Sequence, residues 1–297
     1  MIEAASPGTG TPDHRQTAPY GNLHIYYLGG RPGAGLARLG RDFIGNWQEE
    51  DCAFLFFSRP APEAVAQLVA ENSGLRLLDQ FQMTYDEWQG GGWSAFRVGP
   101  LAIVPAWEPA GPCADAEAPT IRLDPGVVFG TGAHPTTRDC LEAMVRACRG
   151  RSGQSALDLG TGTGLLALAA ARLGCRRVLA VDLNQLAVRT ARDNIRRNEL
   201  ADRVLAVQGR AETFVNVPCD LMIANIHYDV MRGLITAPGF LQKRRFILSG
   251  LLRSEVRAVL FQLKKMPVTI VRQWEREGTW HTLYGRVDNT AAPAAAG

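Results

Sequence analysis

Residues 155–164 of this 297-residue chain read SALDLGTGTG, and this stretch decides the fold. Its first five residues have the apolar character of a buried strand, and an apolar helix is expected directly after the glycines, at 165–173. The alternating glycines let the chain turn sharply and let a bound molecule approach the backbone. The stretch therefore predicts a strand, a turn and a helix that together form a ligand site.

Two acidic residues indicate which ligand this turn binds. Asp158 precedes the glycines, where a carboxylate can hold the amino group of a ligand directly or through water. Asp182 ends the next strand, residues 178–182, where it can accept hydrogen bonds from both ribose hydroxyls. The turn also lacks the spaced third glycine of the dinucleotide pattern GxGxxG. These features favour S-adenosylmethionine, although the turn alone also fits an ordinary Gly-rich loop or a nicotinamide dinucleotide site.

The chain around this turn alternates between short apolar strands and helices from residue 119 onward. Repeated β-α-β units predict a parallel sheet with right-handed crossovers, so the fold class is α/β. Strands are expected at 177–181, 204–207, 221–224 and 246–249, helices at 185–198 and 254–264, and a closing hairpin at 268–274 and 280–287.

A separate, small α+β unit is expected at residues 22–85. A connector at 86–118 follows it, and the tryptophans of this connector are expected to pack the two units together rather than line a site. The main domain is expected at 119–288, between a disordered leader at 1–21 and a disordered tail at 289–297. Within the small unit, strands are expected at 23–28, 53–57 and 75–83, and a helix at 62–72.

The composition excludes several classes of protein. Apolar residues make up 46% of the chain and the formal net charge is only +3, which gives no strong nucleic-acid signal. No apolar stretch is long enough to span a bilayer, and the N-terminus lacks the pattern of a secretory signal. The six cysteines form no C-x-x-C pair and complete no zinc spacing with the histidines, so no metal site is expected. We expect a soluble, cytoplasmic protein.

Residues 123–137, LDPGVVFGTGAHPTT, resemble the signature of the ribosomal protein L11 methyltransferase family, L-D-P-G-x-x-F-G-T-G-x-H-P-T-T. The resemblance continues through 193–198, 224–226 and 248–252, and covers roughly residues 119–287. It implies a Rossmann-like, seven-stranded class I methyltransferase domain with S-adenosyl-L-methionine as cofactor, preceded by a small substrate-recognition domain. It further implies protein methylation at lysine or α-amino groups, with ribosomal protein L11 as the candidate partner.

The resemblance also assigns roles to individual residues. Thr137 and Gly162 are implied to bind the cofactor, Gly160 to lie against its amino-acid moiety, and Asp182 to hold the ribose. Asn225 is implied to line the methyl-transfer channel next to the cofactor and is the candidate catalytic residue, as an acceptor that positions the amine. Phe129, Thr131 and His134 are weaker candidates for the mouth of this channel, and a structural role is favoured for His134.

The acceptor is the open part of this hypothesis. Residues 22–85 match no known recognition domain, and the family's tryptophan-rich connector pattern is only partly present at 85–99. Residues 225–228, NIHY, match neither the usual N-I-L of the family nor the N-P-P-Y of enzymes that methylate glutamine amides or adenine. The alternatives are a methyltransferase for a small molecule, a glutamine amide or RNA, and an inactive protein that only binds the cofactor.

Methyl transfer to an amine demands little acid–base chemistry from the protein. The displacement occurs in line at the sulfonium methyl carbon, so alignment of the nucleophile is the main requirement. A lysine amine must first lose a proton, and an apolar channel helps because desolvation disfavours the charged form. No side chain stands out in the sequence as an obligatory base.

Overall fold

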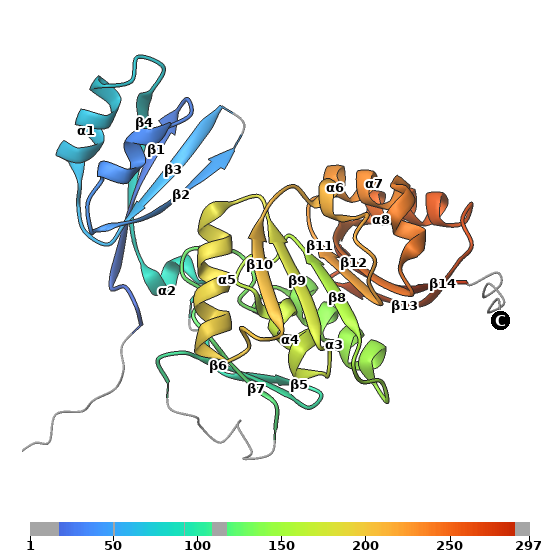
Figure 1. Ribbon diagram of the computed structural model, residues 1–297. Helices are drawn as coiled ribbons and strands as arrows, with labels where there is room; N and C mark the ends of the chain where they lie inside the picture. The colour runs from blue at the N-terminus through green and yellow to red at the C-terminus, as the bar shows by residue number, and fades with distance from the viewer. Residues whose placement is uncertain (1–17, 50, 92, 109–117, 289–297) are drawn as a thin grey trace, which may run out of the picture.

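The N-terminal unit is an antiparallel sheet with the strand order β2-β3-β1-β4 (Figure 1). The structure is a computed structural model that describes residues 18–49, 51–91, 93–108 and 118–288, so the expected tail and most of the expected leader lie outside the described residues. Buried side chains on one face of the sheet pack against α1, because Val65 and Leu68 of that helix point inward. The elements are β1 (Asn22–Gly29), η1 (Ala34–Arg38), β2 (Phe43–Glu49), β3 (Cys52–Phe57), α1 (Pro62–Ala70) and β4 (Arg76–Thr84).

The main domain contains a seven-stranded sheet with the order β10-β9-β8-β11-β12-β14-β13. Five neighbouring strands are parallel, and β14 is antiparallel to both of its neighbours, so the predicted parallel sheet and the closing hairpin are confirmed. The strands are β8 (Ser155–Leu159), β9 (Arg177–Asp182), β10 (Val204–Gln208), β11 (Leu221–Asn225), β12 (Arg245–Leu252), β13 (Val268–Arg276) and β14 (Trp280–Val287).

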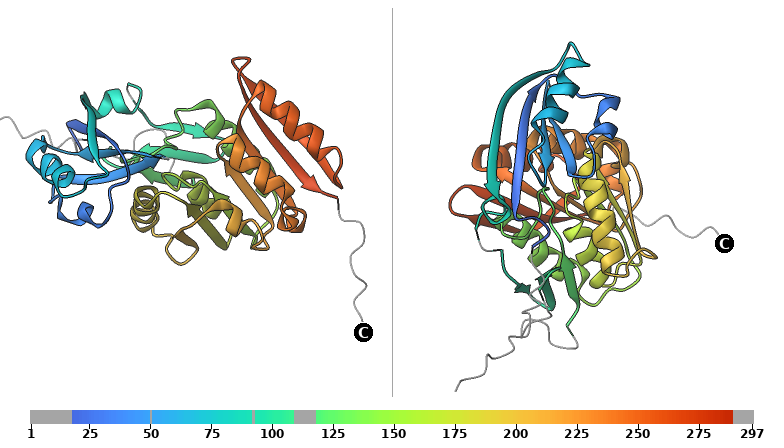
Figure 2. Two further views of the ribbon diagram at one scale, coloured as in Figure 1. Left: turned by 90° about the horizontal axis from the view of Figure 1, so that it is seen from above. Right: turned by 90° about the vertical axis from the view of Figure 1, so that its left-hand side faces the viewer.

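The strands of this sheet are apolar throughout because both faces are covered. In β11, Leu221 and Ile223 join one buried cluster, whereas Met222 and Ala224 join another on the opposite face. Helices α3, α4 and α5 cover the first face and α6, α7 and α8 the second (Figures 1 and 2). The helices are α3 (Pro135–Cys148), α4 (Leu165–Arg172), α5 (Gln185–Arg197), α6 (Ala211–Phe214), α7 (Tyr228–Thr236), η2 (Pro238–Gln242) and α8 (Arg253–Leu263).

The expected connector at 86–118 holds regular structure of its own. A short helix, α2 (Tyr85–Trp88), is closed by a capping box in which the side chains of Thr84 and Glu87 each accept a backbone N–H of the other. The strands β5 (Phe96–Val98) and β6 (Leu101–Pro105) then form a three-stranded sheet with β7 (Thr120–Leu123). Because β6 and β7 are parallel neighbours, this part of the connector belongs to the main domain.

Direct packing between β2 and α5 joins the two units. A Cβ atom on Gly45 would lie only 2.6 Å from the Leu186 side chain, so the backbone of β2 touches α5. The guanidinium group of Arg189 donates a hydrogen bond to the carbonyl of Ile44. The small unit is therefore anchored beside the carboxyl ends of the parallel strands.

The tryptophans of the connector pack against other aromatic side chains. Trp88 packs edge-on against Trp47 and Phe56 of the small unit, with ring centroids 5.9 and 5.2 Å apart. Trp107 contacts Tyr85 and Trp93, with centroids 6.1 and 5.7 Å apart. The expectation that the tryptophans of the connector pack the two units together is therefore confirmed for Trp88.

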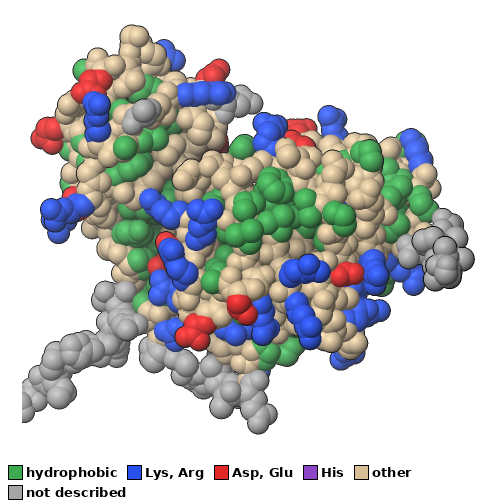
Figure 3. Space-filling view, in the orientation of Figure 1, with side chains coloured by type: hydrophobic (Ala, Val, Ile, Leu, Met, Phe, Trp, Pro, Cys, Tyr) green, Lys and Arg blue, Asp and Glu red, His purple; other side chains and the backbone are tan. Residues whose placement is uncertain are grey.

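Several basic side chains of α5 have partners within the chain. Lys and Arg side chains are dispersed over the face in Figure 3, several of them beside acidic ones. In α5, Arg192 donates to the carbonyl of Ala206 at 3.0 Å, and Arg197 lies 3.5 Å from Asp124. Among the residues that the structure describes, no helix is long and apolar enough to cross a membrane.

Candidate functional site

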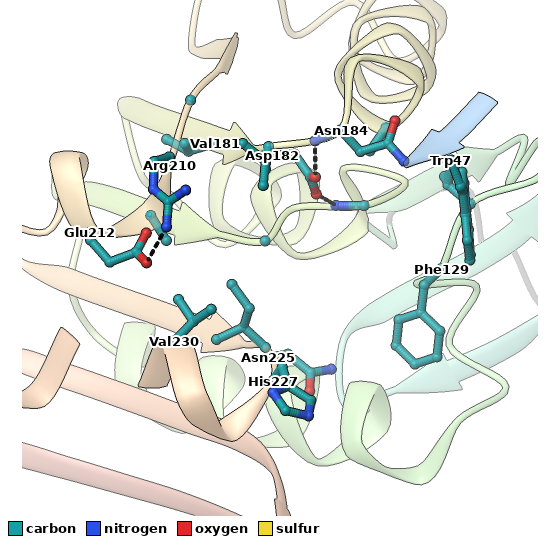
Figure 4. A pocket seen from close by; sticks show the side chains of 18 residues that line it. Trp47, Phe129, Val181, Asp182, Asn184, Arg210, Glu212, Asn225, His227 and Val230 are labelled. Carbon is teal, nitrogen blue, oxygen red and sulfur yellow. Dashed lines mark hydrogen bonds and ion pairs between the residues drawn. The ribbon is translucent and has the colours of Figure 1, made fainter. Parts of the chain in front are cut away.

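A cavity of about 370 Å³ lies at the carboxyl ends of the parallel strands (Figure 4). The strand order reverses here, since the chain passes from β8 outward to β9 and β10 and then returns to β11 on the other side. Open α/β sheets bind their ligands at such a switch point. Its wall includes residues at the ends of four neighbouring strands, namely Gly160, Asp182, Gly209 and Asn225.

The glycine-rich turn forms the floor of this cavity. Gly160 and Gly162 line it, as the sequence predicts for a ligand that approaches the backbone. Gly162 has a φ of +53°, and a Cβ atom there would lie 2.2 Å from the carbonyl oxygen of Phe129. No other residue type fits this contact, because the obstacle is backbone rather than a movable side chain.

The segment 126–132 is held against this turn through its carbonyl groups. Thr163 donates its backbone N–H to Phe129 at 3.0 Å and its hydroxyl to Gly130 at 2.7 Å. Neighbouring carbonyls accept from the side chains of the connector and of α3: Gly126 from Gln89, Thr131 from Trp93 and Gly132 from Arg138. The signature segment and the glycine-rich turn thus form one rigid wall.

Asp182 is half-buried and lines the cavity. One carboxylate oxygen accepts the backbone N–H of Gly162 at 2.9 Å, and the other accepts that of Asn184, also at 2.9 Å. Each oxygen keeps a further lone pair, so the group can still accept hydrogen bonds from a diol. Burial raises the pKa of this carboxyl group, while the backbone N–H donors act in the opposite direction.

Asp158 lies beneath the turn rather than in the wall of the cavity. Its side chain is fully buried, and one oxygen accepts the Thr161 hydroxyl at 2.6 Å. The other oxygen has no hydrogen-bond partner among the described residues. Burial raises the pKa of Asp158 to about 7. The hypothesis that it holds the amino group of a ligand stays a prediction, and the unpartnered oxygen is the atom available for that contact.

Asn225 ends β11 and is fixed by two hydroxyl groups of α3. Its amide nitrogen donates to Thr136 at 3.3 Å and to Thr137 at 3.5 Å. Thr137 is only 1% exposed and does not line the cavity, so it reaches the site through Asn225 rather than directly. The amide oxygen of Asn225 accepts no hydrogen bond from the described residues, and a Cβ atom on Gly250 would lie 3.0 Å from it.

His134 has the structural role favoured for it and does not itself line the cavity. It caps α3, with Nδ1 at 2.7 Å from the Thr136 hydroxyl and 3.4 Å from its backbone nitrogen. Its ring also lies 4.8 Å from that of Trp280 and 5.5 Å from that of Phe129, which lines the cavity. Burial lowers the pKa of His134, which favours the neutral imidazole. Thr131 does not line the cavity, whereas Phe129 does and is 54% exposed.

The structure adds cavity residues that the sequence did not predict. Trp47 reaches the cavity from β2 of the small unit, on the same side as Phe129 (Figure 4). On the far side, Arg210 and Glu212 follow β10 and lie 3.3 Å apart as an ion pair. The position after a parallel strand marks Arg210 as a site candidate, whereas nothing in the sequence of β2 places Trp47 here.

Three features define the class I methyltransferase fold: the strand order, the antiparallel strand β14 and the acidic residue Asp182 at the end of β9. Residues 74–288 match the family model for ribosomal protein L11 methyltransferase (PrmA). The chain belongs to this family.

Relatives that are named ribosomal protein L11 methyltransferase support this assignment. The ribosomal protein L11 methyltransferase of Enterococcus faecalis is 37% identical over 185 residues, which cover 62% of this chain and 58% of that protein. The one from Caldicellulosiruptor bescii is 36% identical over 189 residues, which cover 62% of this chain and 59% of that protein. The match thus spans less than two thirds of these relatives' length. The crystal structure of a ribosomal protein L11 methylase from Lactobacillus delbrueckii subsp. bulgaricus superposes with a TM-score of 0.56 at 28% identity, covering 66% of this chain and all of the other.

Proposed function

We propose that this chain transfers a methyl group from S-adenosylmethionine to an amino group of ribosomal protein L11. The family membership supports the reaction class, and the relatives named above supply the substrate. The observation that carries the proposal is the orientation of Asn225, whose amide nitrogen is engaged by two hydroxyl groups while its oxygen remains available beside the cavity.

The residues around the cavity fit the cofactor. Its volume lies within the range of small-molecule sites. Asp182 would accept the ribose hydroxyls, while the backbone at Gly160 and Gly162 would lie against the amino-acid moiety. Beneath them, the unpartnered oxygen of Asp158 suits a cationic amino group, which would satisfy a buried acceptor that otherwise has no partner among the described residues.

Asn225 would align the acceptor amine for an in-line displacement. Its amide oxygen and the carbonyl oxygen of Ile226 both lie near Gly250, since a Cβ atom there would be 3.0 and 3.4 Å from them. Two acceptors near one point can receive two N–H bonds of an amine and direct its lone pair. Apolar wall residues such as Ile226 and Val230 disfavour the charged form of the amine. When bound, the cofactor supplies the electrophilic methyl group.

The small unit would recognise the protein substrate. Most of this unit precedes residues 74–288, which match the family model. Its Trp47 contributes to the cavity wall. We therefore assign 22–85 to substrate recognition, 86–118 to the connection between the units, and 119–288 to catalysis. We place the reaction in the cytoplasm, where ribosomal proteins are made.

Transfer of a tritiated methyl group tests this function. Purified protein, labelled S-adenosylmethionine and purified ribosomal protein L11 should give a labelled L11 band. Asn225→Ala should lose this label and still bind the cofactor, whereas Asp182→Ala should lose cofactor binding in calorimetry. Label that appears only in small molecules, RNA or glutamine amides of an extract would replace L11 with another acceptor. Saturable cofactor binding without any transfer would indicate an inactive binding protein.

A further inference from the structure

A cavity of about 780 Å³ lies along α3 and shares no lining residue with the candidate cofactor site. Most of the charged side chains around it are arginines, namely Arg97, Arg138, Arg146, Arg149 and Arg276. Among the described residues that line it, Glu142 is the one acidic side chain. We call this cavity the basic groove, and the proposed function does not use it.

The basic groove has α3 as its floor. Arg138, Glu142 and Arg146 follow one another at intervals of four residues, so they share one face of the helix. The turn after β5 forms one side, since a Cβ atom on Gly99 would lie only 3.1 Å from the Val145 side chain. The end of β13 forms the other side. The charged side chains therefore project into a cavity between three elements rather than from an isolated helix.

The charge of Glu142 is already engaged within the protein. One of its carboxylate oxygens lies 3.3 Å from Arg276, and the other accepts the indole N–H of Trp274 at 2.9 Å. Arg276 also lies 2.7 Å from the fully buried carboxylate of Asp139. These four side chains form one closed network between α3 and β13, which leaves the other arginines without an acidic partner in the groove.

Three of these arginines keep an unneutralised charge. Among the residues that the structure describes, Arg138, Arg146 and Arg149 form no ion pair with a carboxylate. Arg138 is also fixed in place, because its Nε donates to the carbonyl of Gly132 at 3.0 Å and its guanidinium lies 4.8 Å from the centre of the Phe96 ring. A planar guanidinium without such a partner suits an anionic ligand, since it binds carboxylates through paired hydrogen bonds.

One end of the basic groove lies beside the candidate site. Pro135 lines the groove and follows His134, whose ring lies 5.5 Å from that of Phe129 in the wall of the cofactor cavity. The other end lies at the opposite edge of the sheet, where Arg245 at the start of β12 donates to the carbonyl of Ala147 in the last turn of α3. The groove thus leads away from the site along the whole length of α3.

We propose that the basic groove binds an acidic segment of the protein substrate that carries the acceptor amine. The proposal rests on the proposed function, because the occupant belongs to the same polypeptide as that amine. Along α3, the distance from Arg138 to Arg149 is about 16 Å, at 1.5 Å for each residue. An extended peptide of about five residues spans this distance. The small unit packs against α5, so the substrate would be bound by two separate elements.

An RNA strand is the other anionic occupant to consider. Proteins that bind single strands combine basic side chains with aromatic rings on which the bases stack. Among the described residues, no aromatic ring lines the basic groove, and the Phe96 ring beside it lies under the guanidinium of Arg138. Because the groove begins beside the candidate site, its occupant is continuous with the acceptor, which the proposed function places on a polypeptide. The observations therefore favour the acidic peptide.

Binding of a fluorescent hexaglutamate peptide to the full-length protein, followed by anisotropy, tests the groove without any turnover. Arg146→Ala/Arg149→Ala should weaken binding by about 10-fold, the loss expected for two exposed charge pairs. Arg146→Lys/Arg149→Lys keeps the charge and should lose about 3-fold or less. Arg257→Ala/Lys264→Ala is the matched control, because it removes the same charge from exposed positions of α8, on the other face of the sheet, and should follow the wild type.

Methyl transfer to ribosomal protein L11 then tests whether the groove acts on the substrate. Arg146→Ala/Arg149→Ala should raise KM by about 10-fold and leave kcat within about 2-fold, since the groove would hold the ground state and the transition state equally. In about 0.5 M salt the KM effect should largely disappear, because salt screens exposed charges.

The outcomes separate failure of the groove from failure of the proposed function. An unchanged KM for L11 in Arg146→Ala/Arg149→Ala overturns the role of the groove and leaves the proposed function intact. Hexauridylate RNA that binds more tightly than hexaglutamate, and is lost in the same variant, overturns the acidic peptide in favour of RNA. Selective hexaglutamate binding without any methyl transfer to L11 by the wild type overturns the proposed function and supports the groove as a site for acidic segments.

Discussion

Replacement of Asp158 by Asn should stabilise the ligand-free protein at neutral and higher pH. The Asp158 side chain is fully buried, with a pKa raised from an ordinary 3.8 to about 7, chiefly by desolvation. In the unfolded chain the carboxyl group loses its proton near pH 4, whereas in the folded chain it keeps the proton up to about pH 7. The folded state therefore binds more protons between these values, and the free energy of unfolding falls as the pH rises through this window.

The size of the effect follows from the pKa difference. Each pKa unit corresponds to about 1.4 kcal/mol, so the change from 3.8 to about 7 corresponds to at most about 4 kcal/mol above pH 7. Asn carries no charge, and its carbonyl can still accept the Thr161 hydroxyl that Asp158 accepts at 2.6 Å. Any packing cost of the buried NH₂ group is independent of pH, so the change with pH isolates the contribution of the carboxylate.

Urea unfolding of the two proteins at pH 5, 6, 7 and 8 measures this difference. The advantage of Asp158→Asn should grow by about 2.5 kcal/mol between pH 5 and pH 8 and level off above pH 7. Asp202→Asn is the matched control, because that carboxylate is 72% exposed and pairs with its neighbour Arg203 on the surface. A difference between wild type and Asp158→Asn that stays constant with pH would refute the reasoning. A weaker affinity of this variant for S-adenosylmethionine at pH 8 would support the predicted contact with the cofactor's amino group.

Three further variants test the geometry of the site. Gly162→Ala should lower the free energy of unfolding by about 2 kcal/mol or more in urea titrations. The reason is that its Cβ would lie 2.2 Å from the Phe129 carbonyl oxygen, at a φ of +53°. An unchanged unfolding midpoint would contradict this contact. Thr136→Val removes a hydroxyl that accepts from Asn225 and should lower kcat by about 10-fold, with calorimetric cofactor affinity within about 2-fold; equal losses in both would argue for a general disruption. Gly250→Ala places a Cβ 3.0 Å from the Asn225 amide oxygen and should lower kcat in the same selective way, so a wild-type rate would remove the amide oxygen from the acceptor site.

The alternation of strands and helices in the main domain could be predicted because each element carries its own signal. β8, β9 and β11 are short apolar runs, since both faces of each strand are buried. The right-handedness of the crossovers restricts the strand orders that are possible, whereas the order itself comes from the structure. The sequence pattern does not predict α3. The cap of this helix, His134, lies within the signature segment, which is interpreted as part of the ligand site and not as the start of a helix.

Strands with irregular or mixed patterns escape prediction. β2 contains Gly45, where the register against β3 shifts, and its end is polar, so no regular alternation marks it. β5 and β6 are only three and five residues long, and β6 is stabilised by a partner, β7, that begins 15 residues after β6 ends. Such strands form because of contacts that are distant in the sequence, so a local pattern does not reveal them.

The candidate site shows the same division between local and distant information. Gly160, Gly162, Asp182 and Asn225 line the cavity, because each stands at the carboxyl end of a parallel strand or in the turn that follows it. Trp47 could not be found, since its strand has no clear pattern and its place in the wall depends on how the small unit packs against α5.

The motif residues of this site occupy two layers, and the layers should differ in what they control. Asp182 and the glycines of the turn form the wall, so their substitution acts on the binding of the cofactor. Thr136 and Thr137 are buried behind the wall and act through the hydrogen bonds that they accept from Asn225. Because a buried polar group must be satisfied, these two hydroxyl groups fix one orientation of the Asn225 amide. A sequence motif does not distinguish the two layers. The structure separates the residues that line the cavity from the residues that hold them in position.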